Sequence, residues 1–224
     1  MIKDNVAELL KTIPAQNPFG EPITLVAATK TQTVDKINQA IAAGITDIGE
    51  NKAQEFRDKF DLVLPCRYHF FGRLQKNKVK YLIGKACLIQ SVDDLSLAEE
   101  IDRQSLARSI VTDILIEINL GEAQKGGIPL PSAKKEYERI RSLRSVRVRG
   151  FMAVLPDTEN AETLSECCLQ MRSLYDIIKK DDENISILSM GMSHDYLTAI
   201  KYGSNMVRIG TKIFGARDYS LPRT

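Results

Sequence analysis

The sequence of 224 residues is poor in the residue types on which many binding sites are built, with no tryptophan, two histidines and four cysteines. The cysteines show no CxxC or other metal-ligand spacing, so core packing explains them better and we expect no metal site. No apolar run approaches the ~20 residues of a membrane span. Residues 1–13 resemble neither a signal peptide nor a transit peptide. We therefore expect a cytoplasmic protein with no membrane partner.

The chain also lacks a strong excess of charge, since its formal net charge is +2. Basic residues gather in two stretches, 73–85 and 139–149, but charge runs of this kind are usually solvated faces. Because nucleic-acid-binding proteins depend on a basic surface that neutralises phosphates, we expect no nucleic-acid partner. The first stretch could instead dock an acidic partner, and the sequence leaves its role open.

What the chain does contain is one repeated unit: an apolar strand, a short polar turn and an amphipathic helix. Strands that alternate with helices indicate a parallel sheet. The hydrophobic pattern predicts strands at residues 23–28, 46–49, 68–71, 87–91, 111–118, 146–154, 185–190 and 206–209.

Closure of this sheet into a (β/α)8 barrel of the TIM type fits the number of units, and about 250 residues is typical of that fold. The helical pattern of residues 1–13 adds an extra N-terminal helix. An open, doubly wound α/β sheet is the alternative, but no GxGxxG motif follows the first strand and the units fill the whole chain. We therefore expect a single barrel domain over residues 1–224.

Several polar residues predict where helices begin and end. Asn51 followed by Gln54 resembles a capping box, and Ser91 with Asp94 forms a similar pair after the fourth strand. Gly44 is expected to end the helix before the second strand, because glycine tolerates a positive φ.

The ends of the last two strands indicate a phosphate site. Barrel enzymes place functional residues at the carboxyl ends of strands and often hold phosphate in the loops after strands 7 and 8. Strand 7 is followed by Gly191 and Ser193, and strand 8 by Gly210 and Thr211. A glycine allows close backbone approach and a hydroxyl adds a donor. Each pair alone is weak evidence, but both lie where a phosphate is expected.

Lys30 is unusual because it follows a buried strand almost at once. Barrel closure makes strands 1 and 8 neighbours, so Lys30 should face the same mouth as Arg208. Lys30 could point to solvent or pair with phosphate, or it could be a nucleophile that forms a Schiff base with a carbonyl. Position alone leaves both open. His69, by contrast, is expected to be a structural histidine bonded within the barrel.

Six segments resemble, in order, one known family: "AATKT", "GENKAQEF", "HFFGRLQKNK", "GFMAV", "SMGMSHDYLTAI" and "VRIGTKIFGAR". This is the pyridoxal phosphate homeostasis protein family (YggS type, also called proline synthetase co-transcribed proteins). The resemblance runs from about Leu25 to Arg217. It implies the alanine-racemase-like barrel, fold type III among proteins that bind pyridoxal 5′-phosphate (PLP).

The resemblance also implies roles for individual residues. Lys30 matches the lysine that forms a covalent aldimine with PLP, and Arg208 matches the arginine that faces the pyridine nitrogen. Three further residues match positions that hold the phosphate of PLP: Ser193, Gly210 and Thr211. Asn51 matches an asparagine beside the cofactor, and Met152 matches a residue that lines the pocket. The chain departs from the usual pattern at Ala28–Thr29, Lys76 and Asn205, none of which is a cofactor contact.

The resemblance implies a PLP-binding protein that buffers the cofactor or supplies it, with apo PLP-dependent enzymes as candidate recipients, and we expect it to be a monomer. A PLP-dependent racemase-like enzyme is the alternative. We favour the carrier because no all-β domain follows Arg217 and no tyrosine or cysteine can be placed opposite Lys30 as a second base. An arginine at the pyridine nitrogen also weakens the ring as an electron sink. A Schiff-base aldolase, a third possibility, would leave Arg208 without a ring nitrogen to meet.

Overall fold

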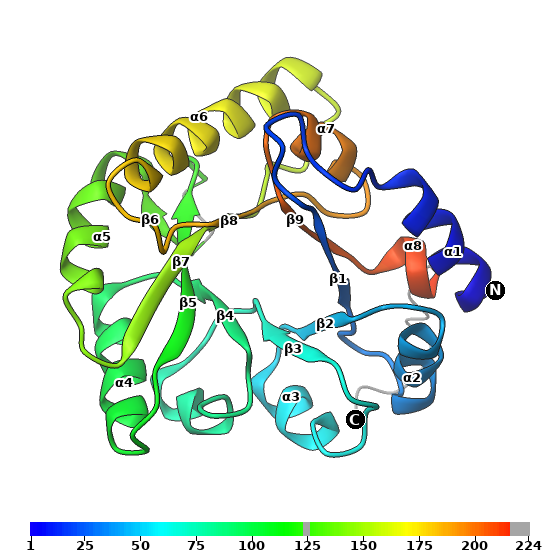
Figure 1. The fold of residues 1–224 in the computed structure, drawn as a ribbon, viewed down its shortest axis with the longest axis horizontal. Helices are drawn as coiled ribbons and strands as arrows, with labels where there is room; N and C mark the ends of the chain where they lie inside the picture. The colour runs from blue at the N-terminus through cyan, green and yellow to red at the C-terminus, as the bar shows by residue number, and fades with distance from the viewer. Residues whose placement is uncertain (123–125, 216–224) are drawn as a thin grey trace.

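The computed structural model, which describes residues 1–122 and 126–215, contains a closed ring of parallel strands surrounded by helices (Figure 1). The ring closes because β9 pairs with β1 and β4 pairs with β5. Its strands are β1 (Thr24–Ala28), β2 (Asp47–Glu50), β3 (Arg67–Phe70), β4 (Leu88–Val92), β5 (Thr112–Asn119), β7 (Val146–Ala153), β8 (Ile187–Ser189) and β9 (Met206–Ile209).

The predicted barrel is confirmed, and the ends of the predicted strands agree with the structure within about two residues. One further strand, β6 (Ile128–Pro129), was not predicted and pairs only with the carboxyl end of β5. Two residues are too short to produce a recognisable hydrophobic alternation. The last motif of the sequence ends at Arg217, which lies outside the described residues.

Helices follow the strands and form the outer layer (Figure 1). The extra N-terminal helix is confirmed as α1, which packs against α2 and α8 and is tied to α8 by a 3.0 Å hydrogen bond from Asn5 Nδ2 to Ile213 O. No helix in the described part of the chain is long and apolar enough to cross a membrane. The α-helices are α1 (Ile2–Thr12), α2 (Val34–Ala42), α3 (Ala53–Lys59), α4 (Leu95–Leu106), α5 (Ala133–Arg141), α6 (Ala161–Lys179), α7 (Tyr196–Lys201) and α8 (Thr211–Phe214), and the 3₁₀ turns are η1 (Lys76–Tyr81) and η2 (Leu130–Ser132).

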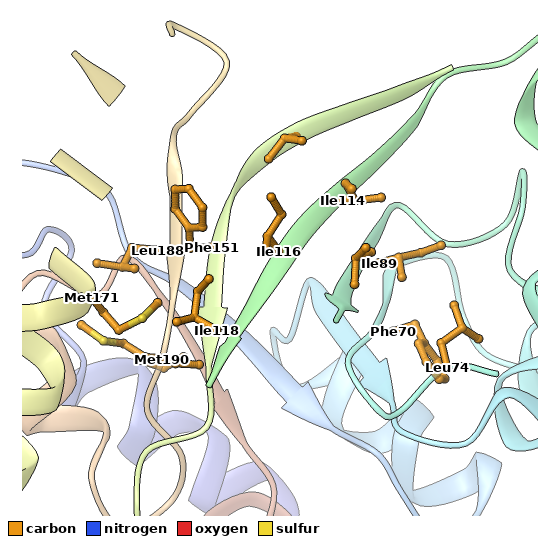
Figure 2. Packing of buried hydrophobic residues seen from close by; sticks show 14 of the residues in the cluster. Phe70, Leu74, Ile89, Ile114, Ile116, Ile118, Phe151, Met171, Leu188 and Met190 are labelled. Atoms are coloured by element: carbon orange, nitrogen blue, oxygen red, sulfur yellow. The ribbon is translucent and has the colours of Figure 1, made fainter. Parts of the chain in front are cut away.

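Successive side chains of each strand point to opposite faces, which divides the core in two. The outward-facing side chains pack against the helices in the main core, part of which appears in Figure 2 around Ile116, Phe151 and Leu188. Full burial of one such side chain contributes about 1.5–3 kcal/mol. The inward-facing apolar side chains form a separate, smaller cluster of Val26, Leu88, Leu115, Met152 and Met206.

The predicted helix boundaries are confirmed only in part. Gly44 has the expected positive φ of 114° just after α2. The prediction that Asn51 caps a helix is wrong, because the N-cap residue of α3 is Lys52 and Asn51 lies one residue before it. At α4 the capping residue is Asp94, whose side chain accepts a 2.7 Å hydrogen bond from the Leu97 N–H. Ser91 instead lies in β4 and donates to the Gly72 carbonyl.

Candidate functional site

All of the residues predicted for the site lie at the carboxyl ends of barrel strands. Strands that run in the same direction end at one mouth of the barrel, so these positions share that mouth. Lys30 follows β1, Asn51 follows β2, and Met152 is the next-to-last residue of β7. Ser193 follows β8, Arg208 lies within β9, and Gly210 and Thr211 come directly after it.

Arg208 is a buried cation with a fixed orientation. Its side chain donates from Nη1 to Ser189 Oγ at 2.6 Å and from Nη2 to the Ala153 carbonyl at 2.9 Å. Burial lowers the pKa of Arg208 to about 10, so the guanidinium is still charged at neutral pH. Its two partners belong to β8 and β7, so the guanidinium lies between the carboxyl ends of these strands.

The backbone around Lys30 is held from both sides. Before it, the Thr29 N–H donates to the Gly49 carbonyl at 2.9 Å, and the Thr29 carbonyl accepts from Lys59 Nζ at 3.2 Å. After it, Thr31 has a φ of 64°, which is strained for a β-branched residue and costs about 1–3 kcal/mol. The Thr31 N–H donates to Glu55 Oε2 at 2.9 Å. The strained turn therefore depends on α3 for its position.

Lys59 is a competing amine that lies against the backbone next to Lys30, and its contacts occupy that amine. Its Nζ lies 2.7 Å from Glu50 Oε1 and 2.8 Å from Glu55 Oε2, with little exposure to solvent. Its amine is therefore occupied by two carboxylates of the chain and by the Thr29 carbonyl. The sequence analysis missed this cluster, although the i, i+4 spacing of Glu55 and Lys59 on α3 was an available signal.

Asn51 carries an unused acceptor. Its Oδ1 is buried and has no hydrogen-bond partner among the residues that the structure describes. Leaving a buried acceptor unpaired costs about 1–3 kcal/mol. The chain packs tightly here, since a Cβ added to Gly72 would lie 1.9 Å from the Asn51 carbonyl oxygen. A polar ligand could donate a hydrogen bond to this Asn51 oxygen. The surroundings of Asn51 therefore fit a contact with a cofactor better than the predicted role as a helix cap.

The two predicted phosphate loops are neighbours. The Arg208 N–H donates to the Gly191 carbonyl at 3.0 Å, which joins the loop after β8 to β9. Gly191 has a φ of 98°, and a Cβ there would lie 2.7 Å from Ala199 Cβ, so glycine is required. Ser193 is buried, and a Cβ on Gly210 would lie 3.2 Å from the Ala28 carbonyl oxygen. These contacts hold the two loops close together at the mouth of the barrel.

Glu117 was missed by the sequence analysis, although an acidic residue within the apolar strand β5 was an available signal. It pairs in register with Met152. Burial, with repulsion from Asp93, raises the pKa of Glu117 to about 7 despite the attraction of Arg208 and Arg73. The site therefore contains a carboxyl group that changes its charge near neutral pH.

Replacing Glu117 should change how stability depends on pH. Because the folded pKa lies above the ordinary value of 4.5, the fold favours the neutral carboxyl, and its contribution is lost as pH rises toward 7. From pH 5 to pH 8 the wild type should lose up to about 3 kcal/mol more unfolding free energy than Glu117→Gln. Urea denaturation at both pH values measures the unfolding free energies. Glu138→Gln, at an exposed position of α5, is the control. Equal pH dependence in wild type and Glu117→Gln would contradict the assignment.

The predicted structural role of His69 agrees with its surroundings. The side chain is fully buried, with Nε2 2.8 Å from Asp47 Oδ1 and Nδ1 3.2 Å from Gln90 Nε2. Both ring nitrogens are thus engaged inside the barrel.

Comparisons with known sequences agree with this architecture. The model of the alanine racemase N-terminal domain matches residues 2–218. The pyridoxal phosphate homeostasis protein of Aquifex aeolicus is 42% identical over 87% of each chain. That of Pasteurella multocida is 36% identical over 98% of this chain and 99% of its own. That of Escherichia coli K12 is 38% identical over 89% of this chain and 88% of its own.

Solved structures extend the comparison. PipY of Synechococcus elongatus with PLP bound is 27% identical and has a TM-score of 0.84, covering 96% of this chain and 100% of its own. The same protein without PLP has a TM-score of 0.87. An alanine racemase of Clostridium difficile in complex with cycloserine has a TM-score of 0.76 at 13% identity, which shows the fold alone. This chain covers 59% of that racemase.

Proposed function

Because this chain belongs to the pyridoxal phosphate homeostasis protein family, we propose that it binds PLP at the mouth of its barrel and passes the cofactor to other proteins. In this proposal Lys30 holds PLP covalently and Asn51 contacts its side. Met152 packs against the ring, and the phosphate lies against Ser193, Gly210 and Thr211. The likeness to PipY with PLP bound supports the choice of cofactor.

The single observation that carries the proposal is the fixed, buried guanidinium of Arg208. A cation beside the pyridine nitrogen opposes its protonation, and the pyridine ring then stabilises a carbanion poorly. Such a site suits holding a cofactor better than rapid chemistry on amino acids.

The residues present fit PLP. When bound, PLP supplies an aldehyde that condenses with a neutral amine and releases water. Lys30 provides that amine, because its backbone is pinned at the mouth while Lys59 is ion-paired with Glu50 and Glu55. The unpaired Asn51 Oδ1 accepts a hydrogen bond from a donor of the ligand.

A second candidate is a PLP-dependent racemase-like enzyme, since the racemase barrel is shared. Racemisation needs an acid and a base on opposite faces of the α-carbon. Lys30 can serve only one face. We therefore retain the carrier, acting as a cytoplasmic monomer built on one barrel domain, as the proposed function.

The test mixes PLP-loaded protein with the apo form of a PLP-dependent aminotransferase. Its activity should return faster than with the same concentration of free PLP, because an amine of the acceptor can attack the cofactor directly at an open mouth. Protein whose cofactor has been fixed by borohydride is the control and should restore no activity. Recovery no faster than with free PLP would contradict transfer. In parallel, amino-acid racemisation at about 1–1000 per second would favour the enzyme.

A further inference from the structure

A line of polar side chains crosses the interior of the barrel beneath the proposed cofactor site. It passes through β2, β3, β4, β8 and β9 and lies among the inward-facing apolar cluster. Burying polar groups in such surroundings is unfavourable unless each is hydrogen-bonded. All members are less than 5% exposed, and they are Asp47, His69, Gln90, Ser189 and Arg208.

The hydrogen bonds of this line can be followed in one direction, from Arg208 to Asp47. A guanidinium only donates, so Ser189 Oγ accepts from Arg208 at 2.6 Å. The single Ser189 hydrogen then goes to Gln90 Oε1 at 2.7 Å. That contact turns the Gln90 amide nitrogen toward His69 Nδ1 at 3.2 Å and toward Met206 Sδ at 3.3 Å.

The line ends on a carboxylate. Since His69 Nδ1 accepts from Gln90, the ring carries its proton on Nε2 and donates to Asp47 Oδ1 at 2.8 Å. Burial opposes ionisation of Asp47, but the hydrogen bond from His69 and that from Thr46 hold its pKa below the usual value. Every member therefore donates toward the next, from the cation to the anion.

We propose that Gln90 and His69, anchored by Asp47, are positioning residues that hold the Arg208 guanidinium against the pyridine nitrogen of PLP. The inference rests on the proposed function. Without Gln90, the Ser189 hydroxyl would be free to rotate, and its lone pair would no longer be fixed toward Arg208. Arg208 would then keep one oriented acceptor, the Ala153 carbonyl, and could turn away from the ring. The line thus links the core of the barrel to the electronic state of the cofactor.

The first test needs no cofactor. The chain has only two histidines, His69 and His194, so their imidazole nitrogens are readily resolved by long-range ¹H–¹⁵N NMR. His69 should donate from Nε2 and accept at Nδ1, and Gln90→Leu should disturb that pattern while His194 is unchanged. A proton on His69 Nδ1 in the wild type would overturn the proposed direction.

The second test measures the ring nitrogen itself. Wild type should bind PLP about 10–100-fold more tightly than 1-deaza-PLP, in which a C–H replaces the ring nitrogen, because a charge-assisted hydrogen bond is lost. Gln90→Leu should remove most of this preference and shift the absorption band of bound PLP. The control is Ser105→Ala, which removes an equally buried hydrogen bond to Thr112 at 2.7 Å and should preserve the preference.

The outcomes separate this proposal from the function on which it rests. If Gln90→Leu weakens PLP and 1-deaza-PLP equally, or if wild type binds both alike, the positioning role is overturned. If wild type binds neither, the proposed function fails, while the His69 tautomer still decides whether the directed line exists. Should Gln90→Leu not fold, Ser189→Ala removes a single oxygen of the same line and should show the same loss of preference.

Discussion

Borohydride reduction of the PLP-loaded protein is expected to fix one phosphopyridoxyl group on the peptide that contains Lys30, and Lys30→Ala should abolish this labelling. Only a lysine imine is reduced to a stable secondary amine, so the label marks the residue that holds the cofactor. Lys30 lies at the barrel mouth within a strained turn that Glu55 and Lys59 support. Mass spectrometry of the digested protein measures the site directly.

The control for this experiment is Lys52→Ala, which removes a nearby lysine that is 60% exposed and pairs with Glu55 at 3.3 Å. That variant should be labelled as fully as the wild type. A label on Lys52, Lys76 or Lys212 would show that the covalent assignment is wrong. A label on Lys59 would mean that its ion pairs with Glu50 and Glu55 do not keep its amine from the cofactor.

Removal of the phosphate should have the second large effect. Pyridoxal, which lacks the phosphate, should bind at least about a hundredfold more weakly than PLP. Charge-assisted hydrogen bonds contribute about 1.5–3 kcal/mol each, and at least two would be lost. The Ser193 and Gly210–Thr211 loops provide those contacts in the proposed site. Fluorescence or absorbance titration of the apo protein with both vitamers measures the ratio.

Variants of the loops should reduce this ratio rather than shift both affinities equally. Ser193→Ala should lower PLP affinity with little effect on pyridoxal, whereas Thr211→Ala should be milder because its backbone N–H remains. Ser165→Ala on α6, whose hydroxyl donates to the Ala161 carbonyl of the same helix, is the matched control. Equal binding of PLP and pyridoxal by the wild type would mean that these loops hold something else.

Features of the site that depend on local sequence could be predicted. Lys30, Gly191, Ser193, Gly210 and Thr211 could be placed at the barrel mouth because each follows a strand whose apolar pattern is visible in the chain. A strand end fixes which mouth of a parallel barrel a residue faces, so position along the chain was sufficient. The roles of Asn51 and Met152 came only from resemblance to a family.

Features that depend on distant partners could not be predicted. Ser189 and Gln90 are 99 residues apart in the chain, and Gln90 and His69 are 21 apart, yet all three meet inside the barrel. Asn51 was predicted to cap a helix because its local spacing to Gln54 fits, but the helix begins beyond Lys52. A local pattern cannot show which side chain a folded backbone leaves unpaired.

The barrel could be predicted from the chain alone, because the period of apolar residues depends on local backbone geometry and strands alternating with helices restrict the topology. The electrostatics of the site could not be predicted without the folded arrangement. The pKa of Glu117, the ion pair of Lys59 with Glu50 and the fixed guanidinium of Arg208 all result from burial and from groups on other strands or helices. Coulomb and desolvation energies depend on distance in space, which closure of the barrel alone establishes.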